Sequence, residues 1–205
     1  MTTVITGDIV KSGTYTNPEA WLEPLKMALT NTGISAQYWE IFRGDSFQIE
    51  VDDNLRAFSI AIYIKACIKT VYGLDVRMAI GIGNKNFEGN KVSESNGEAF
   101  IFSGETFEAL KQEKTNLKIK TPNEHLNTEL NLYFRLASIA MDNWTVNSSE
   151  AFKIALENPK ALQSEIAAII GISQDAVSKR LKRAYYHDIL ELDDMYRHKI
   201  ANYLL

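Results

Sequence analysis

The sequence predicts an α+β fold in which a part with strands and helices is followed by an all-helical part. Three observations lead to this prediction. Strand and helix patterns alternate up to about residue 120, strand patterns are absent from Glu124 onward, and 45% apolar with 10% aromatic residues suit packed cores. We therefore expect domains at residues 1–121 and 122–205, with Thr121-Pro122-Asn123 as the boundary.

The first part contains six elements in the order β-α-β-β-α-β. They are a strand at 2–7, a helix from Asn17-Pro18 to about Asn31, strands at 38–42 and 47–51, a helix capped by Asp52-Asp53, and a strand at 75–82. This order is the ferredoxin-like arrangement, in which the first and third strands are neighbours. A polar loop from 83 to 96, a helix through Phe107 and Leu110 and a short strand at 117–119 complete the domain.

Two motifs each place an aspartate at the end of an expected strand, Asp8 after the first and Asp45 in Arg43-Gly44-Asp45-Ser46-Phe47. Gly44-Asp45 is typical of a two-residue type II′ hairpin turn. Because the topology brings these strands together, we expect Asp8 near Asp45. Neighbouring carboxylates repel, and a bound Mg²⁺ or Mn²⁺ relieves that repulsion. The alternative is that Asp8 caps the following loop and Asp45 is simply a turn residue.

The loop after the first strand is a candidate site for phosphate oxygens. Its backbone N–H groups lie where the strand opens toward its helix, and Lys11 or Arg43 adds positive charge. The residues that we expect to contact a nucleoside triphosphate or a nucleotide second messenger are Val10, Lys11, Ser12, Gly13, Arg43 and Gly44.

Residues 163–185 have the pattern of a helix-turn-helix. Gly171 suits a left-handed turn, Ser173 suits an N-cap, and apolar anchors follow at helical spacing. The residues expected to face the major groove are Gln174, Asp175, Ser178, Lys179 and Lys182, with Arg180 and Arg183 nearer the phosphates of double-stranded DNA. The alternative is a helical hairpin that packs on a partner protein, because acidic residues of the last helix dilute the basic cluster.

These motifs resemble known families. Asp8-Ile9, Gly44-Asp45-Ser46-Phe47 and residues 77–83 resemble the palm-type catalytic domain of class III nucleotide cyclases and GGDEF diguanylate cyclases. Thr6-Gly7-Asp8-Ile9-Val10, the Arg43 hairpin and the helix-turn-helix together resemble the SatD family of small bacterial proteins. The resemblance to the cyclases covers roughly the first half of the chain.

The resemblance to cyclases implies a metal site formed by Asp8, Asp45 and the carbonyl of Ile9. Ser46 stands where GGDEF proteins have an acidic residue, and residues 93–102 do not match the asparagine and arginine with which cyclases hold the transition state. We therefore expect binding of a nucleotide rather than its turnover.

Charge and composition narrow the classes of function. The formal net charge of −4 gives no overall attraction to nucleic acid, so any DNA contact must be local. The single cysteine, Cys67, excludes an internal disulfide and is expected to be a buried thiol. The three histidines have no metal-ligand spacing. No stretch is long enough to span a bilayer and no signal segment is evident, so we expect a cytoplasmic protein without membrane contact.

The sequence thus predicts a bacterial transcriptional regulator, with a nucleotide-binding domain joined to a DNA-reading domain and a homodimer as the unit that binds an operator. Tyr196, Ile200, Tyr203 and Leu204 are candidates for the dimer seam, or alternatively close the core of the helical part. The competing hypothesis is an enzyme, a metal-dependent nucleotidyl cyclase or nucleotidyltransferase whose helical part serves dimerisation.

Overall fold

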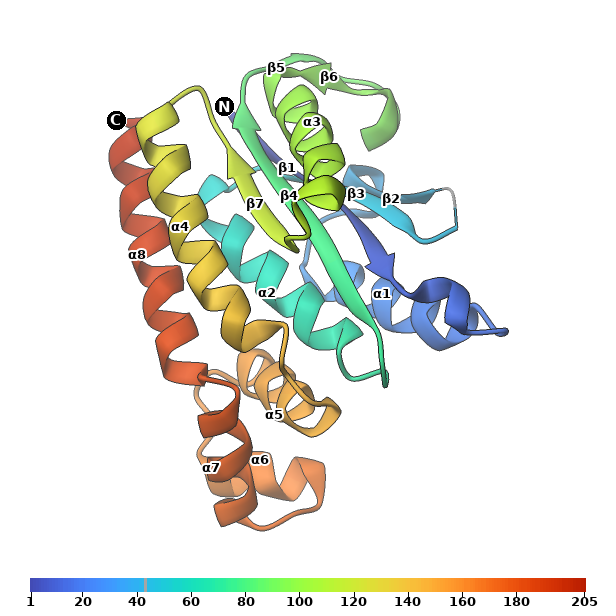
Figure 1. Ribbon diagram of the computed structural model, residues 1–205, viewed down its shortest axis with the longest axis vertical. Helices are drawn as coiled ribbons and strands as arrows, with labels where there is room; N and C mark the ends of the chain where they lie inside the picture. The colour runs from blue at the N-terminus through green and yellow to red at the C-terminus, as the bar shows by residue number, and fades with distance from the viewer. Residues whose placement is uncertain (43) are drawn as a thin grey trace.

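The structure is a computed structural model that describes residues 1–42 and 44–205 (Figure 1). The strands are β1 (Thr2–Val10), β2 (Trp39–Phe42), β3 (Ser46–Val51), β4 (Asp75–Gly83), β5 (Lys85–Phe87), β6 (Asn96–Gly97) and β7 (Leu117–Lys120). The helices are α1 (Glu19–Asn31), α2 (Ala57–Ile68), α3 (Glu98–Glu113), α4 (Glu124–Met141), α5 (Val146–Glu157), α6 (Gln163–Ile170), α7 (Gln174–Arg183) and α8 (Tyr186–Leu204). The protein is therefore a mixed α+β structure, as the sequence predicts.

Five strands form one mixed sheet in the order β2-β3-β1-β4-β7. Neighbours are antiparallel except for β4 and β7, which are parallel. β1 is thus central and lies beside β3, the pairing expected from the order of the elements. β7 joins β4 through the crossover helix α3, as a parallel pair requires.

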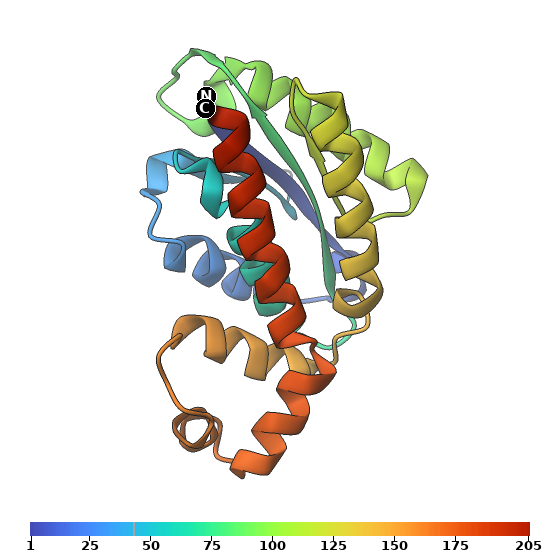
Figure 2. The ribbon, with the colours of Figure 1, turned by 90° about the vertical axis from the view of Figure 1, so that its left-hand side faces the viewer.

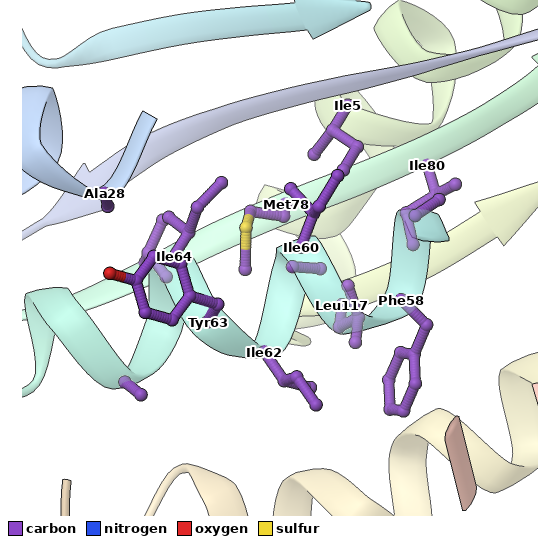
Figure 3. Packing of buried hydrophobic residues seen from close by; sticks show 14 of the residues in the cluster. Ile5, Ala28, Phe58, Ile60, Ile62, Tyr63, Ile64, Met78, Ile80 and Leu117 are labelled. Carbon is purple, nitrogen blue, oxygen red and sulfur yellow. The ribbon is translucent and has the colours of Figure 1, made fainter. Parts of the chain in front are cut away.

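The two faces of the sheet are covered by different helices. Ile5, Met78 and Ile80 point to the face that packs on α1 and α2 (Figure 3). On the other face α3 lies close to β4, because Gly81 has no Cβ: a Cβ there would lie 2.2 Å from the carbonyl oxygen of Ala99. Helix α2 is buried on all sides, since α4 and α8 pack on the side that faces away from the sheet (Figure 1).

Helices α4 and α8 belong to the main hydrophobic core. Phe58 of α2 stacks on Phe134 of α4 with ring centroids 4.7 Å apart, and Tyr196 of α8 packs against both rings. The hydroxyl of Tyr196 donates to the carbonyl of Asn54 at 3.0 Å. The main core therefore includes residues from both sides of Thr121.

Helices α5, α6 and α7 extend from one end of this body and have a small core of their own (Figure 2). That core consists of Ala151, Ala155, Ile166, Ala167, Val177 and Leu181. Within the part of the chain that the structure describes, no helix has both the length and the apolar character needed to cross a bilayer.

Two local expectations were wrong or incomplete. Phe42 pairs with Ser46, so three residues separate β2 from β3, and the two-residue type II′ join is excluded. Gly44 lies at φ 88°, a positive φ that glycine adopts without strain. The segment expected to be only a polar loop contains the small antiparallel ribbon β5–β6, whose short strands lack an alternating apolar pattern.

Candidate nucleic-acid interface and the Asp8–Asp45 region

The helix-turn-helix predicted at 163–185 is present as α6, a turn and α7. Gly171 ends α6 at φ 77°, and the hydroxyl of Ser173 accepts a hydrogen bond from the N–H of Ala176 at 3.2 Å, so both local signals are confirmed. At the start of α6, the carboxylate of Glu165 accepts the N–H of Leu162 at 2.6 Å. Both helices are thus capped individually, which fixes their bounds.

Helix α7 is held by one face and leaves the other exposed. Val177 and Leu181 are buried against α5 and α6. The exposed side chains on the opposite face are Gln174, Asp175, Ser178, Lys179, Lys182 and Arg183. This face combines side chains able to hydrogen-bond base edges with ammonium and guanidinium groups able to contact phosphates.

Arg180 does not join this exposed face. Its guanidinium forms a 2.7 Å ion pair with Glu150 of α5, and its side chain is only 18% exposed. Lys179 does remain on the exposed face, and its 2.7 Å pair with Asp175 is solvent-exposed on both sides. An exposed pair of this kind contributes at most about 1 kcal/mol, so a phosphate can displace it.

Asp8 lies near the end of β1, opposite Ser46 of β3 and Arg77 of β4. Arg77 holds both of its carboxylate oxygens, with Nε 3.0 Å from Oδ1 and Nη2 2.7 Å from Oδ2. The Asp8 side chain is 11% exposed and that of Arg77 is 25% exposed. Such a bidentate, largely buried pair already neutralises Asp8.

Asp45 lies beside the same end of β1 as Asp8. Its carbonyl accepts the N–H of Ile9 at 3.1 Å, and its carboxylate accepts a short hydrogen bond from the hydroxyl of Ser12. The fold thus brings Asp8, Ile9 and Asp45 to neighbouring positions, but it gives the two carboxylates different partners.

These partners do not suit a divalent cation. A metal ion at Asp8 has to compete with the guanidinium of Arg77 for the same two oxygens. Among the residues that the structure describes, no three His, Cys, Asp or Glu side chains form a group able to hold a metal ion. The Mg²⁺ or Mn²⁺ site at Asp8, Ile9 and Asp45 stays a prediction, and no chemical step is assigned to it.

The residues expected to contact phosphate lie in two places. Val10 and Lys11 line a cleft beside α5, whereas the hydroxyl of Ser12 points to Asp45. Gly13 and Gly44 are exposed in their loops. Arg43 lies outside the described residues.

Comparison of the chain with protein-family models, with curated proteins and with solved structures finds no match. The class of this protein therefore has to be argued from its own helices, strands and side chains.

Sequence reasoning missed a buried cluster of charges near the start of α5. Lys65 of α2 and Lys69, the residue directly after α2, contact Asp75 at the start of β4 and Asp142 at the end of α4. The available signal was the pair of lysines at i and i+4 within an otherwise apolar helix, because a buried lysine requires a carboxylate or carbonyl partner.

Proposed function

We propose that this protein is a bacterial DNA-binding transcriptional regulator that uses α7 as its recognition helix. One observation carries the proposal: α7 is capped, anchored by Val177 and Leu181, and presents a continuous exposed row of polar and basic side chains. In a helix-turn-helix, the second helix enters the major groove with such a face. The location of a regulator of this kind is the cytoplasm.

The proposal includes a homodimer, because helix-turn-helix proteins commonly read two half-sites. Tyr196 and Ile200 are fully buried in the protein's own core, so they are not available as a dimer seam. Tyr203 also packs partly against that core. A dimer therefore needs another surface.

We assign the strand-bearing part to the ferredoxin-like arrangement with β7 added at one edge. The supporting facts are the order β2-β3-β1-β4 and the antiparallel pairing throughout those four strands. In the regulator this part serves as the ligand-sensing body to which the helix-turn-helix is attached.

The experiment is fluorescence anisotropy with labelled random-sequence duplexes over a range of salt concentrations. We expect the double variant Lys179→Ala/Arg183→Ala to weaken binding and to reduce the slope of log K against log salt by about 2, roughly one per lost phosphate contact. The matched control is Lys26→Ala/Lys111→Ala, which removes the same charge from two exposed lysines, each paired with a glutamate of its own helix.

Equal weakening in both double variants would show only a dependence on net charge and would overturn the role of α7. If the wild type binds, selection of sequences from the random pool then identifies the preferred site.

The alternative function is a metal-dependent nucleotidyl cyclase or nucleotidyltransferase. The adjacency of Asp8 and Asp45 supports this enzyme, whereas the ion pair between Asp8 and Arg77 argues against it. Consumption of a nucleoside triphosphate that requires Mn²⁺ and disappears in Asp45→Asn would support the enzyme over the regulator.

A further inference from the structure

A cleft of about 590 Å³ lies between one end of the sheet and the start of α5. It is bounded by the end of β1, by the connection from α2 to β4 and by the connection from α4 to α5. Its size suits a small organic ligand. Because it borders both the sheet and the first helix of the α5–α7 unit, a ligand there contacts both parts of the protein.

Paired charges stand at this cleft: Lys69, Asp75 and Asp142 line it, and the buried Lys65 pairs with both aspartates. Lys65 is 3% exposed and bridges Asp75 at 2.6 Å and Asp142 at 2.7 Å. Lys69 is 8% exposed, lies 3.1 Å from Asp75 and donates to the carbonyl of Asp142 at 2.8 Å. Asn116 donates to the remaining oxygen of Asp142 at 3.0 Å. All four carboxylate oxygens therefore have partners within the cluster.

Lys69 in this cluster can still donate one hydrogen bond to a ligand. An ammonium group has three N–H donors, and the two hydrogen bonds of Lys69 leave one unused. Lys11, which also lines the cleft, adds an exposed ammonium group. The charged residues that line the cleft are Lys11, Lys69, Asp75 and Asp142; Lys65 pairs with both aspartates without lining the cleft and brings the net charge of the group to +1.

The N-terminus of α5 contributes backbone donors. Val146 and Asn147, the first two residues of α5, line the cleft, and their N–H groups have no acceptor within the helix. The N–H of Ser148 is already capped by the hydroxyl of Thr145 at 3.2 Å. The first turn of α5 has no acidic side chain that would repel an anion.

We propose that this cleft binds a phosphate-bearing small molecule of nucleotide size. The ammonium groups of Lys11 and Lys69 contact the phosphate oxygens, and the N–H groups of Val146 and Asn147 contact them from α5. Binding needs neither Asp8 nor Asp45. The site shares only Val10 and Lys11 with the phosphate-binding loop expected from the sequence.

Such a ligand would act on the helix-turn-helix through α5. The ligand connects the loop after β1 directly to α5, and α5 packs on both α6 and α7. The regulatory consequence rests on the proposed function, whereas the binding step does not. We expect the affinity for DNA to differ between the free and the phosphate-bound protein, and the two ligands to affect each other reciprocally.

The test uses the full chain and tripolyphosphate as the probe, in EDTA and at constant ionic strength, by isothermal titration calorimetry. Lys11→Gly removes one ammonium group and suits the left-handed conformation of residue 11, φ 67°. Val146→Pro removes one backbone donor at the first helical position, where proline is best tolerated. Thr145 already has the extended conformation that precedes proline, with ψ 162°.

The matched control is Lys114→Gly, because Lys114 is also left-handed at φ 54° but does not line the cleft. We expect tripolyphosphate to bind the wild type and the control with equal affinity. We expect its affinity for each cleft variant to be lower by about tenfold or more, the loss typical of a charge-assisted hydrogen bond. Thermal unfolding without the probe checks that all variants fold.

Two results would overturn the site: no binding to the wild type, or unchanged affinity in either cleft variant. ATP in the same EDTA buffer then distinguishes a nucleotide from free polyphosphate, since a base and ribose that contact the cleft add affinity. The titration contains no DNA, so failure of the DNA experiment leaves this result intact, and failure of the titration leaves the role of α7 intact.

Discussion

The indole N–H of Trp144 donates a hydrogen bond of 2.9 Å to the backbone carbonyl of Ala184. Trp144 precedes α5, and Ala184 follows α7, so this bond joins the two ends of the α5–α7 unit. Both residues are buried, and the Trp144 ring packs on Phe152 with centroids 4.4 Å apart. The two ends of the α5–α7 unit are therefore held together.

We expect Trp144→Phe to lower the free energy of unfolding by about 2–3 kcal/mol, because the buried carbonyl of Ala184 loses its partner and the smaller ring leaves a gap. Urea unfolding followed by circular dichroism measures the change. Trp39→Phe is the control, since Trp39 is only half-buried on the edge strand β2. Equal losses in the two variants would contradict a special role for this bond.

Substitutions of Arg180 and Lys182 are expected to change stability and DNA binding independently of each other. Arg180→Ala breaks the pair with Glu150 and should lower stability by about 1 kcal/mol while leaving the salt slope of DNA binding unchanged. Lys182→Ala, on the exposed face, should leave stability within about 0.5 kcal/mol and reduce the slope by about 1. Urea unfolding and salt-dependent anisotropy report the two effects, and the opposite pattern would place Arg180 on the DNA.

Cys67 is expected to be unreactive in the folded protein. The residue is 2% exposed, and burial raises the pKa of its thiol to about 12. The reactive thiolate is therefore scarce at pH 8, whereas an unfolded cysteine has a pKa near 8.5. Labelling with a thiol-reactive disulfide should be slow in buffer and rapid in guanidinium chloride. Equal rates in both solvents would show that the helix α2 is not packed as described.

Arg77 is expected to control whether Asp8 binds a cation. Removing the guanidinium in Arg77→Gln leaves Asp8 with an uncompensated charge, so Mn²⁺ should bind more tightly to this variant than to the wild type. Electron paramagnetic resonance of free Mn²⁺ measures the difference, and Arg77→Gln/Asp8→Asn should abolish it. Equal affinity in wild type and Arg77→Gln would mean that the pair does not govern this site.

Signals that lie close together in the sequence predicted the structure well. The helix-turn-helix depends on a glycine, a serine cap and apolar anchors within about twenty residues, and each takes the expected role. The apolar run of α2 likewise predicted a helix with a buried Cys67. Local backbone preferences decide these features, so one sequence is enough.

Features set by distant partners were not predictable in this way. Asp8 and Arg77 are 69 residues apart, and their contact depends on the register between β1 and β4. The charge cluster around Lys65 and the cleft beside α5 both depend on where the end of α4 lies against α2. An amphipathic pattern shows that α4 has an apolar face, but it does not say which element covers that face.

The α5–α7 unit is inserted between two helices that both belong to the main core, α4 before it and α8 after it (Figure 2). Both ends of the chain lie at the far end of the molecule from α6 and α7 (Figure 1, Figure 2). If α7 contacts DNA as proposed, a torque on that helix reaches the sheet along α4 and α8 and through the packing of α5 on α2, where the hydroxyl of Tyr63 donates to Glu157, instead of along one flexible tether. The α5–α7 unit and the sheet would then rotate together, and a fluorophore attached at either terminus would report that rotation from a position far from α7.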